Sequence, residues 1–357
     1  MARLRTLLGL VALASAVVCL ADEKPFPLAI GDSAPALVTA KFVKGTPITS
    51  FEPGKVYVVD MWATWCGPCR RSIPHMTELA KQYGDKINIV GVSVWERKPG
   101  LVEPFVEKMG DKMDYSVATD VWPEGATDGR NGTMASTWMD ASGMTNMGIP
   151  TVFVVGRTGA IEWVGHPDDL AKPLEEVVAG TYDREAFAKK FTADMAVLKA
   201  QVALQTKYRD AVKAKDWPTA ESAVDTMIAK DPTASVMKFT LILMNEDNPV
   251  KAYAYGKEIV GGAIKDNADA LNAIAWTIVD PERAPKVKDL DLALAAAERG
   301  VEVSKRKDYG ILDTLARVYF LKGDKDKAIA TQKEAIALAT DPASKESLEK
   351  TLKEYGG

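Results

Sequence analysis

The stretch Trp62-Ala63-Thr64-Trp65-Cys66-Gly67-Pro68-Cys69-Arg70 decides the fold of the first half of the chain. The run before it, 56–61, is apolar and rich in β-branched residues, which predicts a buried strand. The segment after it, 71–83, carries apolar side chains at helical spacing and predicts a helix. The two cysteines are therefore expected at a strand-to-helix junction.

Cys66 is the expected nucleophile of the pair. The N-terminus of a helix presents unpaired N–H groups and a partial positive charge, which favour the thiolate and lower the pKa of a cysteine placed there. Cys69 follows one turn later, close enough to attack a mixed disulfide at Cys66 and release the bound partner. This is the chemistry of thiol–disulfide exchange.

Two other uses of a Cys-x-x-Cys pair stay open. Such a pair can be half of a zinc site, but two more ligands are needed, and His75 and His166 have no paired spacing. A structural disulfide is the second alternative, although so short a loop removes little entropy from the unfolded chain. We predict neither a metal nor another cofactor.

The segment 60–69, Asp-Met-Trp-Ala-Thr-Trp-Cys-Gly-Pro-Cys, resembles the active-site stretch of thioredoxin. Followed by arginine, it is most similar to the extracytoplasmic thioredoxin-like proteins of the TlpA and ResA type. Pro74 falls where that family has a proline inside the active-site helix. The loop 148–151, Gly-Ile-Pro-Thr, resembles the loop whose cis-proline faces the cysteines, and the resemblance extends over roughly residues 28–180.

The resemblance implies a thioredoxin-like α/β fold with a Cys66–Cys69 redox disulfide. The substrate-binding residues that it implies are Trp65, Gly67, Pro68, Ile149 and Pro150. The intervening Gly-Pro dipeptide resembles the reducing end of the superfamily, in which potentials run from about −270 mV for thioredoxin to about −120 mV for the DsbA-type oxidant. We therefore expect reduction of protein disulfides, with electrons from a membrane thiol donor.

Two carboxylates are candidates for acid–base assistance. Asp60 stands within an apolar strand, where an ionised carboxylate is costly unless it has a partner. Its position six residues before Cys66 matches the buried aspartate of thioredoxin, which the resemblance implicates as proton acceptor for the second cysteine. Glu96 matches an acidic position near the site in ResA-type proteins, and the alternative for it is a structural, solvated strand-end carboxylate.

Residues 1–21 predict a secretory signal peptide. Arg3 and Arg5 precede an apolar run, 7–20, that is shorter than the ~20 residues of a membrane helix, and an uncleaved anchor is the alternative. Cleavage after Ala21 would leave Cys66 and Cys69 as the only cysteines of the mature chain. We expect a periplasmic or cell-envelope protein whose cysteines serve chemistry rather than cross-linking.

The remaining composition is that of a globular protein. The chain has 357 residues, of which 47% are hydrophobic and 26% charged, enough for one or two cores. A net charge of −4 argues against nucleic acid as a main partner.

Residues 22–182 predict the thioredoxin-like domain, because strands and helices alternate along them. The N-terminal extension 22–55, which contains several prolines between short β-like segments, predicts a hairpin at the edge of the sheet. The further expected elements are strands 87–94 and 115–118, helices 100–110, 134–142 and 170–179, and a hairpin of 151–155 with 160–164. The segment 122–146 should roof the redox site. Its apolar residues and the next methionine form either an adaptable substrate surface or a satellite core: Met134, Trp138, Met139, Met144 and Met147.

Residues 183–357 predict a second, all-α domain, because strand signals disappear and helical periodicity runs to the end. Equivalent alanines at 220, 252, 293 and 328 resemble tetratricopeptide repeats in their spacing. Such a solenoid offers a concave face for a peptide or protein partner, and a generic helical appendage is the alternative.

Three functions are weighed. The first is an exported thiol–disulfide oxidoreductase in which Cys66 attacks and Cys69 resolves. The second is a thiol peroxidase, to which the front of the domain has a faint similarity, although a resolving cysteine three residues away is unlike the peroxidatic context. The third is a binding scaffold with an incidental redox pair.

Overall fold

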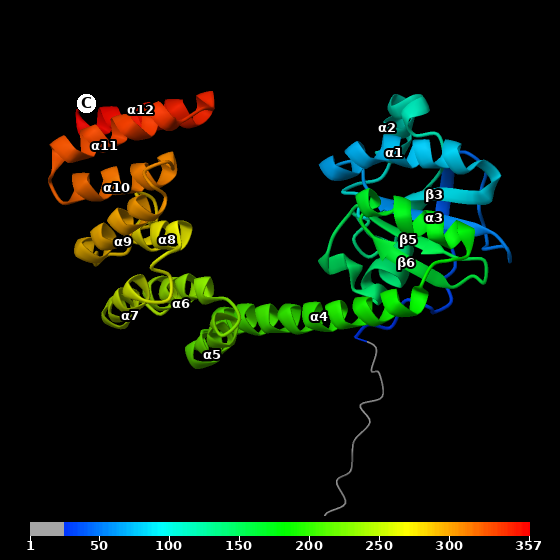
Figure 1. Cartoon of the computed structure of the whole chain (residues 1–357), viewed down its shortest axis with the longest axis horizontal. Coiled ribbons are helices and arrows are strands. Elements are labelled where there is room, and N and C mark those ends of the chain that lie inside the picture. The colour runs from blue at the N-terminus through cyan, green and yellow to red at the C-terminus, as the bar shows by residue number, and fades with distance from the viewer. Residues whose placement is uncertain (1–24) are drawn as a thin grey trace, which may run out of the picture. The chain divides into compact units, whose positions relative to one another are not determined.

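The computed structural model describes residues 25–357, so the predicted signal peptide, 1–21, lies outside the described residues. Contacts divide the chain into two compact units that meet between Ala200 and Gln201. The first unit contains a six-stranded sheet (Figure 1). Its strands are β1 (Thr39–Lys44), β2 (Val56–Trp62), β3 (Ile87–Ser93), β4 (Ser116–Asp120), β5 (Thr151–Val155) and β6 (Ile161–Gly165).

The sheet has the order β1-β4-β3-β2-β5-β6. β2 is parallel to β3 and β3 to β4, whereas β5, β6 and β1 each pair antiparallel with their neighbours. β2 is buried along its whole length, which explains its continuous apolar sequence. The thioredoxin-like α/β fold expected of this half is confirmed.

The predicted hairpin within 22–55 is wrong. Among residues 25–55 the structure has one strand, β1, which lies at the expected sheet edge but pairs with β4. Pro35, Pro47 and Pro53 lie on both sides of it, and proline cannot donate to a strand ladder, so no second strand forms beside it.

Helices cover both faces of the sheet. One face, which includes Val58 and Trp62, packs against α1 (Gly67–Tyr83), α2 (Val102–Met109) and α3 (Ala171–Ala179). The opposite face, which includes Val59 and Met61, packs against the segment 134–144 and the start of α4 (Arg184–Ala214). The remaining short turns of this unit are η1 (Gly84–Lys86), η2 (Gly110–Lys112), η3 (a π-helix, Ala135–Asp140), η4 (Met144–Asn146) and η5 (Pro167–Asp169).

The apolar residues of the segment 122–147 are mostly core. Met134, Trp138, Met139 and Met144 are buried beneath the sheet face that carries Val59. Met147 differs, because 66% of it is exposed. The satellite-core interpretation therefore holds for the first four residues, and Met147 alone among these five presents an apolar surface.

The first unit extends beyond residue 182. Phe187, Phe191 and Met195, from the first half of α4, pack with the cores on the two faces of the sheet. The compact unit therefore ends at Ala200, within α4, whereas the periodicity of the sequence changes at about 182. The assignment of 22–182 and 183–357 as separate domains stays a prediction.

The second unit is helical throughout, as expected. Its helices follow one another along the chain in Figure 1, and most of them contribute side chains to a shared core. After the end of α4 they are α5 (Trp217–Ile228), α6 (Ser235–Thr240), α7 (Pro249–Gly261), α8 (Ala268–Val279), α9 (Leu290–Val303), α10 (Tyr309–Leu321), α11 (Lys325–Leu338) and α12 (Pro342–Tyr355), with a 3-10 helix η6 (Pro232–Ala234) and a π-helix η7 (Leu241–Asn245).

Four of these helices begin in the same way. Before α5, α7, α9 and α11 stands an Asp or Asn whose side chain accepts a hydrogen bond from the backbone N–H three residues on, which caps the helix. The residue that follows the N–H donor is in each case a fully buried alanine, and its small side chain lets a neighbouring helix approach closely. These alanines are the ones expected to be equivalent: Ala220, Ala252, Ala293 and Ala328.

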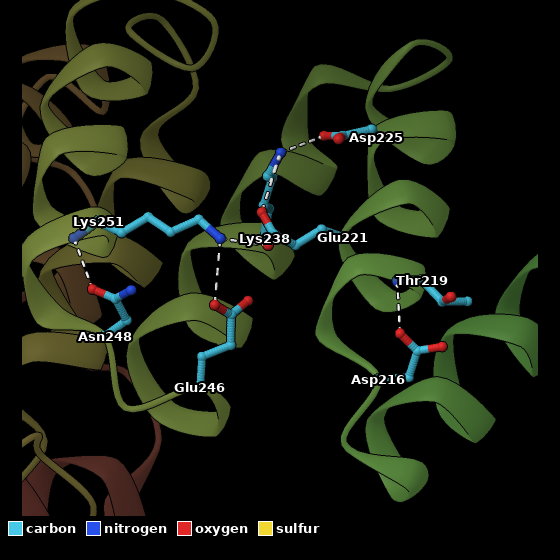
Figure 2. Close-up of polar contacts among 8 residues, drawn as sticks. All are labelled: Asp216, Thr219, Glu221, Asp225, Lys238, Glu246, Asn248 and Lys251. Atoms are coloured by element: carbon cyan, nitrogen blue, oxygen red, sulfur yellow. Dashed lines mark hydrogen bonds and ion pairs between the residues drawn. The ribbon is translucent and has the colours of Figure 1, made fainter.

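Figure 2 shows the polar contacts that join α5, α6 and α7. Glu221 in α5 forms ion pairs with both Lys238 and Lys251, and the second of these lysines also lies 3.3 Å from Glu246. Lys238 reaches Asp225 at 2.7 Å. These side chains are partly exposed, so each pair contributes little by itself, and the shared carboxylate of Glu221 mainly fixes how the three helices are oriented.

Candidate active site

Cys66 and Cys69 form a disulfide at the start of α1. Cys66 is the N-cap residue, and its sulfur accepts a hydrogen bond of 3.1 Å from the backbone N–H of Cys69. Gly67 and Pro68 are the first two residues of the helix, and Pro68 costs no hydrogen bond there. Once the disulfide is reduced, the same N–H and the helix dipole stabilise a thiolate at Cys66.

The cis-proline loop faces Cys66. The peptide bond between Ile149 and Pro150 is cis, and the carbonyl oxygen of Ile149 lies 3.5 Å from the Cys66 sulfur. Cys66 is only 3% exposed. Met147 lies two residues before Ile149 and is exposed.

Glu96 holds the loop that precedes the cysteines. Its carboxylate accepts hydrogen bonds from the backbone N–H and the hydroxyl of Thr64, at 2.6 and 2.7 Å, and from the Ser93 hydroxyl at 2.8 Å. The chain reaches this position because Trp95, with φ of 57°, turns sharply after β3. The buried carboxylate is therefore fully partnered, which differs from a solvated strand-end carboxylate.

Trp65, the residue before Cys66, borders a hollow. Its indole N–H donates to the carbonyl oxygen of Trp95 at 2.9 Å, and the Arg97 guanidinium lies 5.2 Å from the ring centre. The hollow has a volume of about 630 Å³ and is also lined by Asp128 and Arg130. Because 40% of Trp65 is exposed, its ring presents an apolar surface at this hollow.

Asp60 is buried and unpartnered. It is 1% exposed, and neither carboxylate oxygen has a hydrogen-bond partner. Burial raises the pKa of Asp60 to about 7. Since side chains alternate along a strand, Asp60 lies on the same face of β2 as Val58 and Trp62, which is the face that packs against Cys69.

Two more polar groups, neither of which the sequence motifs indicate as site residues, are buried on this face. The indole Nε1 of Trp62 and the hydroxyl of Tyr115 have no hydrogen-bond partner. Both lie over Gly91, which is the register partner of Asp60 on β3. The available signal in the sequence was a glycine in the middle of an apolar strand, since such a residue often marks a close approach of other groups.

The sequence profile of the Redoxin family matches residues 29–182. The thiol:disulfide interchange protein HelX of Rhodobacter capsulatus is 30% identical over 169 residues, which cover 45% of this chain and 85% of HelX. The chain belongs to the redoxin family. With its thioredoxin-like fold and its Cys-x-x-Cys disulfide, it is a thiol–disulfide oxidoreductase.

Other relatives of this redoxin protein cover different shares of the chain. Protein FixW of Rhizobium leguminosarum is 25% identical over 225 residues, which cover 60% of this chain and 96% of FixW. The solved structure of a thioredoxin-family thiol:disulfide interchange protein from Chlorobium tepidum is 25% identical and covers 42% of this chain and 97% of its own, with a TM-score of 0.28.

Proposed function

We propose that this protein is an exported reductant of disulfides in other proteins. The observation that carries the proposal is the position of Cys66, which caps α1, accepts a hydrogen bond from the Cys69 N–H and faces the Ile149 carbonyl oxygen. This arrangement suits a thiolate that attacks a sulfur bound at the cis-proline loop.

The reaction begins with the reduced dithiol. The Cys66 thiolate attacks one sulfur of a substrate disulfide, so that a mixed disulfide forms and the other substrate sulfur leaves as a thiolate and takes up a proton. Cys69 then loses its proton and attacks the Cys66 sulfur. The Cys66–Cys69 disulfide forms, the second substrate thiolate leaves and takes up a proton, and the substrate has gained two electrons and two protons.

Asp60 is the proposed acceptor of the Cys69 proton. A base works best when its pKa lies near the working pH, and burial brings the pKa of Asp60 to about 7. Glu96 has a different proposed part, because Thr64 and Ser93 already occupy its oxygens. It positions the loop that carries Trp65 and Cys66.

Export and the electron donor belong to the same proposal. The pattern of residues 1–21 supports passage through the inner membrane into the periplasm or cell envelope. No helix within residues 25–357 is long and apolar enough to cross a membrane. The Cys66–Cys69 disulfide would then be reduced by the dithiol of a membrane protein, which supplies two electrons and itself becomes a disulfide.

The helical unit is proposed to bind a peptide or protein partner, in the manner of a tetratricopeptide array. The four matching helix starts, each with an Asx cap and a buried alanine, support a repeated architecture. Stacked helix pairs of this kind leave one surface continuous across several repeats, and such surfaces commonly bind extended chains.

Insulin reduction in the presence of a dithiol donor tests the proposed activity. We expect the wild-type chain to be active, and Cys66→Ser to be inactive. Cys69→Ser should accumulate a mixed disulfide with the substrate, because nothing resolves it. A redox titration against glutathione should give a midpoint well below that of the glutathione couple.

The alternatives predict other results. Peroxide turnover without insulin reduction would replace the proposal with a thiol peroxidase. A native pair that reacts with neither substrate would favour a binding scaffold. A pair that stays mostly reduced in ordinary glutathione buffer would contradict the reducing direction.

A further inference from the structure

Three buried polar groups converge beside the redox pair. Asp60 on β2 is paired in register with Gly91 on β3, and a Cβ atom at Gly91 would lie 2.9 Å from Cε2 of Tyr115 and 3.1 Å from Nε1 of Trp62. The absent side chain at Gly91 therefore makes room for the tyrosine ring and the indole next to the carboxylate. Asp60, Trp62 and Tyr115 are all without hydrogen-bond partners.

The three groups are complementary in hydrogen bonding. The indole N–H and the tyrosine O–H are donors, whereas an ionised carboxylate only accepts. A buried polar group without a partner is costly, and an unpaired buried charge is more costly still. Placing two donors around one carboxylate therefore favours the ionised form of that carboxylate.

We propose that Tyr115 is a positioning residue for proton transfer, and that its hydroxyl, assisted by the Trp62 indole N–H, donates a hydrogen bond to Asp60 when that carboxylate ionises. The inference rests on the proposed function, since it assigns the residue that sets the proton affinity of the proposed base. The Tyr115 hydroxyl itself keeps its proton, because burial and then the charge of Asp60 raise the pKa of Tyr115 well above its ordinary value.

Among the described residues, no other ionisable group on the elements that face Asp60 is available to donate a hydrogen bond to its carboxylate. Burial raises the pKa of Asp60. On the facing elements, α1 contributes Cys66 and Cys69, the turn after β3 contributes Glu96, and the residues before β4 contribute Tyr115. Glu96 bonds to Thr64 and Ser93, and the cysteines do not titrate while they form a disulfide. β5 and α3 contribute the apolar side chains Val152 and Leu174.

The test is a titration of the Asp60 carboxyl by carbon-13 NMR in the oxidised full chain, with the signal assigned by its loss in Asp60→Asn. Tyr115→Phe keeps the ring and removes the hydroxyl. We expect the Asp60 midpoint to rise by about one pH unit, which is a roughly tenfold increase in proton affinity. Tyr57→Phe is the matched control, because its side chain lies on the opposite face of β2 and its hydroxyl accepts from Glu52 N–H.

An Asp60 midpoint that is unchanged or lowered in Tyr115→Phe would overturn the inference. Trp62→Phe gives a second measurement and should move the midpoint in the same direction. These titrations do not depend on turnover, so a chain that fails to reduce insulin but shows the shift would refute the proposed function alone. If the proposed function and the inference about Tyr115 are both correct, the rate of insulin reduction should also depend on pH differently in Tyr115→Phe. The acid side of its pH–rate profile should move to higher pH by the same amount as the Asp60 midpoint.

Discussion

The Glu96 carboxylate accepts a hydrogen bond from the backbone N–H of Thr64 at 2.6 Å, across 32 residues of sequence. The bond ties the turn after β3 to the loop that leads into α1. Together with the bonds to the Thr64 and Ser93 hydroxyls, it satisfies a carboxylate that is 3% exposed. The loop that carries Cys66 is thus bonded to a residue that follows another strand, β3.

Glu96→Gln should loosen this loop. The variant replaces one acceptor oxygen with an amide NH2 that faces donors, so the local free energy of unfolding should fall by about 2 kcal/mol. Hydrogen exchange at the Thr64 amide should be faster, whereas the exposed control Glu124→Gln should change nothing. An unaltered exchange rate at Thr64 in Glu96→Gln would show that the loop is held by other contacts.

Asp60→Asn should change how stability depends on pH. The pKa of Asp60 is raised from 3.8 to about 7 in the folded protein, so the folded state holds the proton more tightly than the unfolded chain. Ionising Asp60 in the folded state therefore costs free energy of folding. This cost is absent below pH ~4, grows as the pH rises, and reaches its full value above pH ~7. Asp60→Asn should therefore gain stability over the wild type between pH ~4 and ~8, by at most ~4 kcal/mol.

Chemical denaturation of the oxidised proteins at several pH values measures that difference. Parallel stability curves for the wild type and Asp60→Asn would contradict the raised pKa. The same variant should resolve the mixed disulfide at Cys66 more slowly, because the proposed acceptor for the Cys69 proton is lost.

Met147→Asp should weaken the binding of protein substrates. Met147 is 66% exposed and lies two residues before Ile149, so a charge there would oppose an apolar segment docked beside Cys66. We expect KM for insulin to rise about tenfold, which corresponds to the burial of one apolar side chain. A small disulfide reagent should react at the wild-type rate.

Val250→Asp is the matched control for this prediction. Val250 lies at the start of α7 in the other unit and is 83% exposed. Its substitution should leave KM unchanged for both substrates. If the two variants raised KM for insulin equally, the effect of Met147→Asp would reflect general charge and not contact at the site.

Ala293→Leu should destabilise the helical unit and leave the redox site intact. Ala293 is fully buried where α9 packs against neighbouring helices, and a larger side chain would force them apart at a cost of ~1–3 kcal/mol. Ala295→Leu, on the exposed side of the same helix, is the control. Hydrogen exchange should increase in residues 201–357 for the first variant only, with the glutathione midpoint unchanged in both.

Local signals in the sequence determined the main elements. The strand before Trp62, the helix after Cys66 and the helices of the second unit follow from periodicity, capping and breaker residues, which act over a few neighbours. The same signals fail in 25–55, where an extended, proline-rich segment looks like a hairpin but supplies one edge strand. Strand pairing depends on a distant partner, here β4, which local patterns do not specify.

What only the tertiary structure decided is the surroundings of the two carboxylates. Asp60 and Glu96 were visible as candidates in the sequence, but only the assembled sheet shows that the first carboxylate is unpartnered and the second is fully hydrogen-bonded. Parallel pairing of β2 with β3 sets Asp60 beside Gly91, and the absent side chain there admits Tyr115 and Trp62. The turn after β3 places Glu96 within hydrogen-bond distance of Thr64. Residues far apart in sequence meet because sheet order and the alternation of side chains fix which of them share a face, and that requires the whole fold.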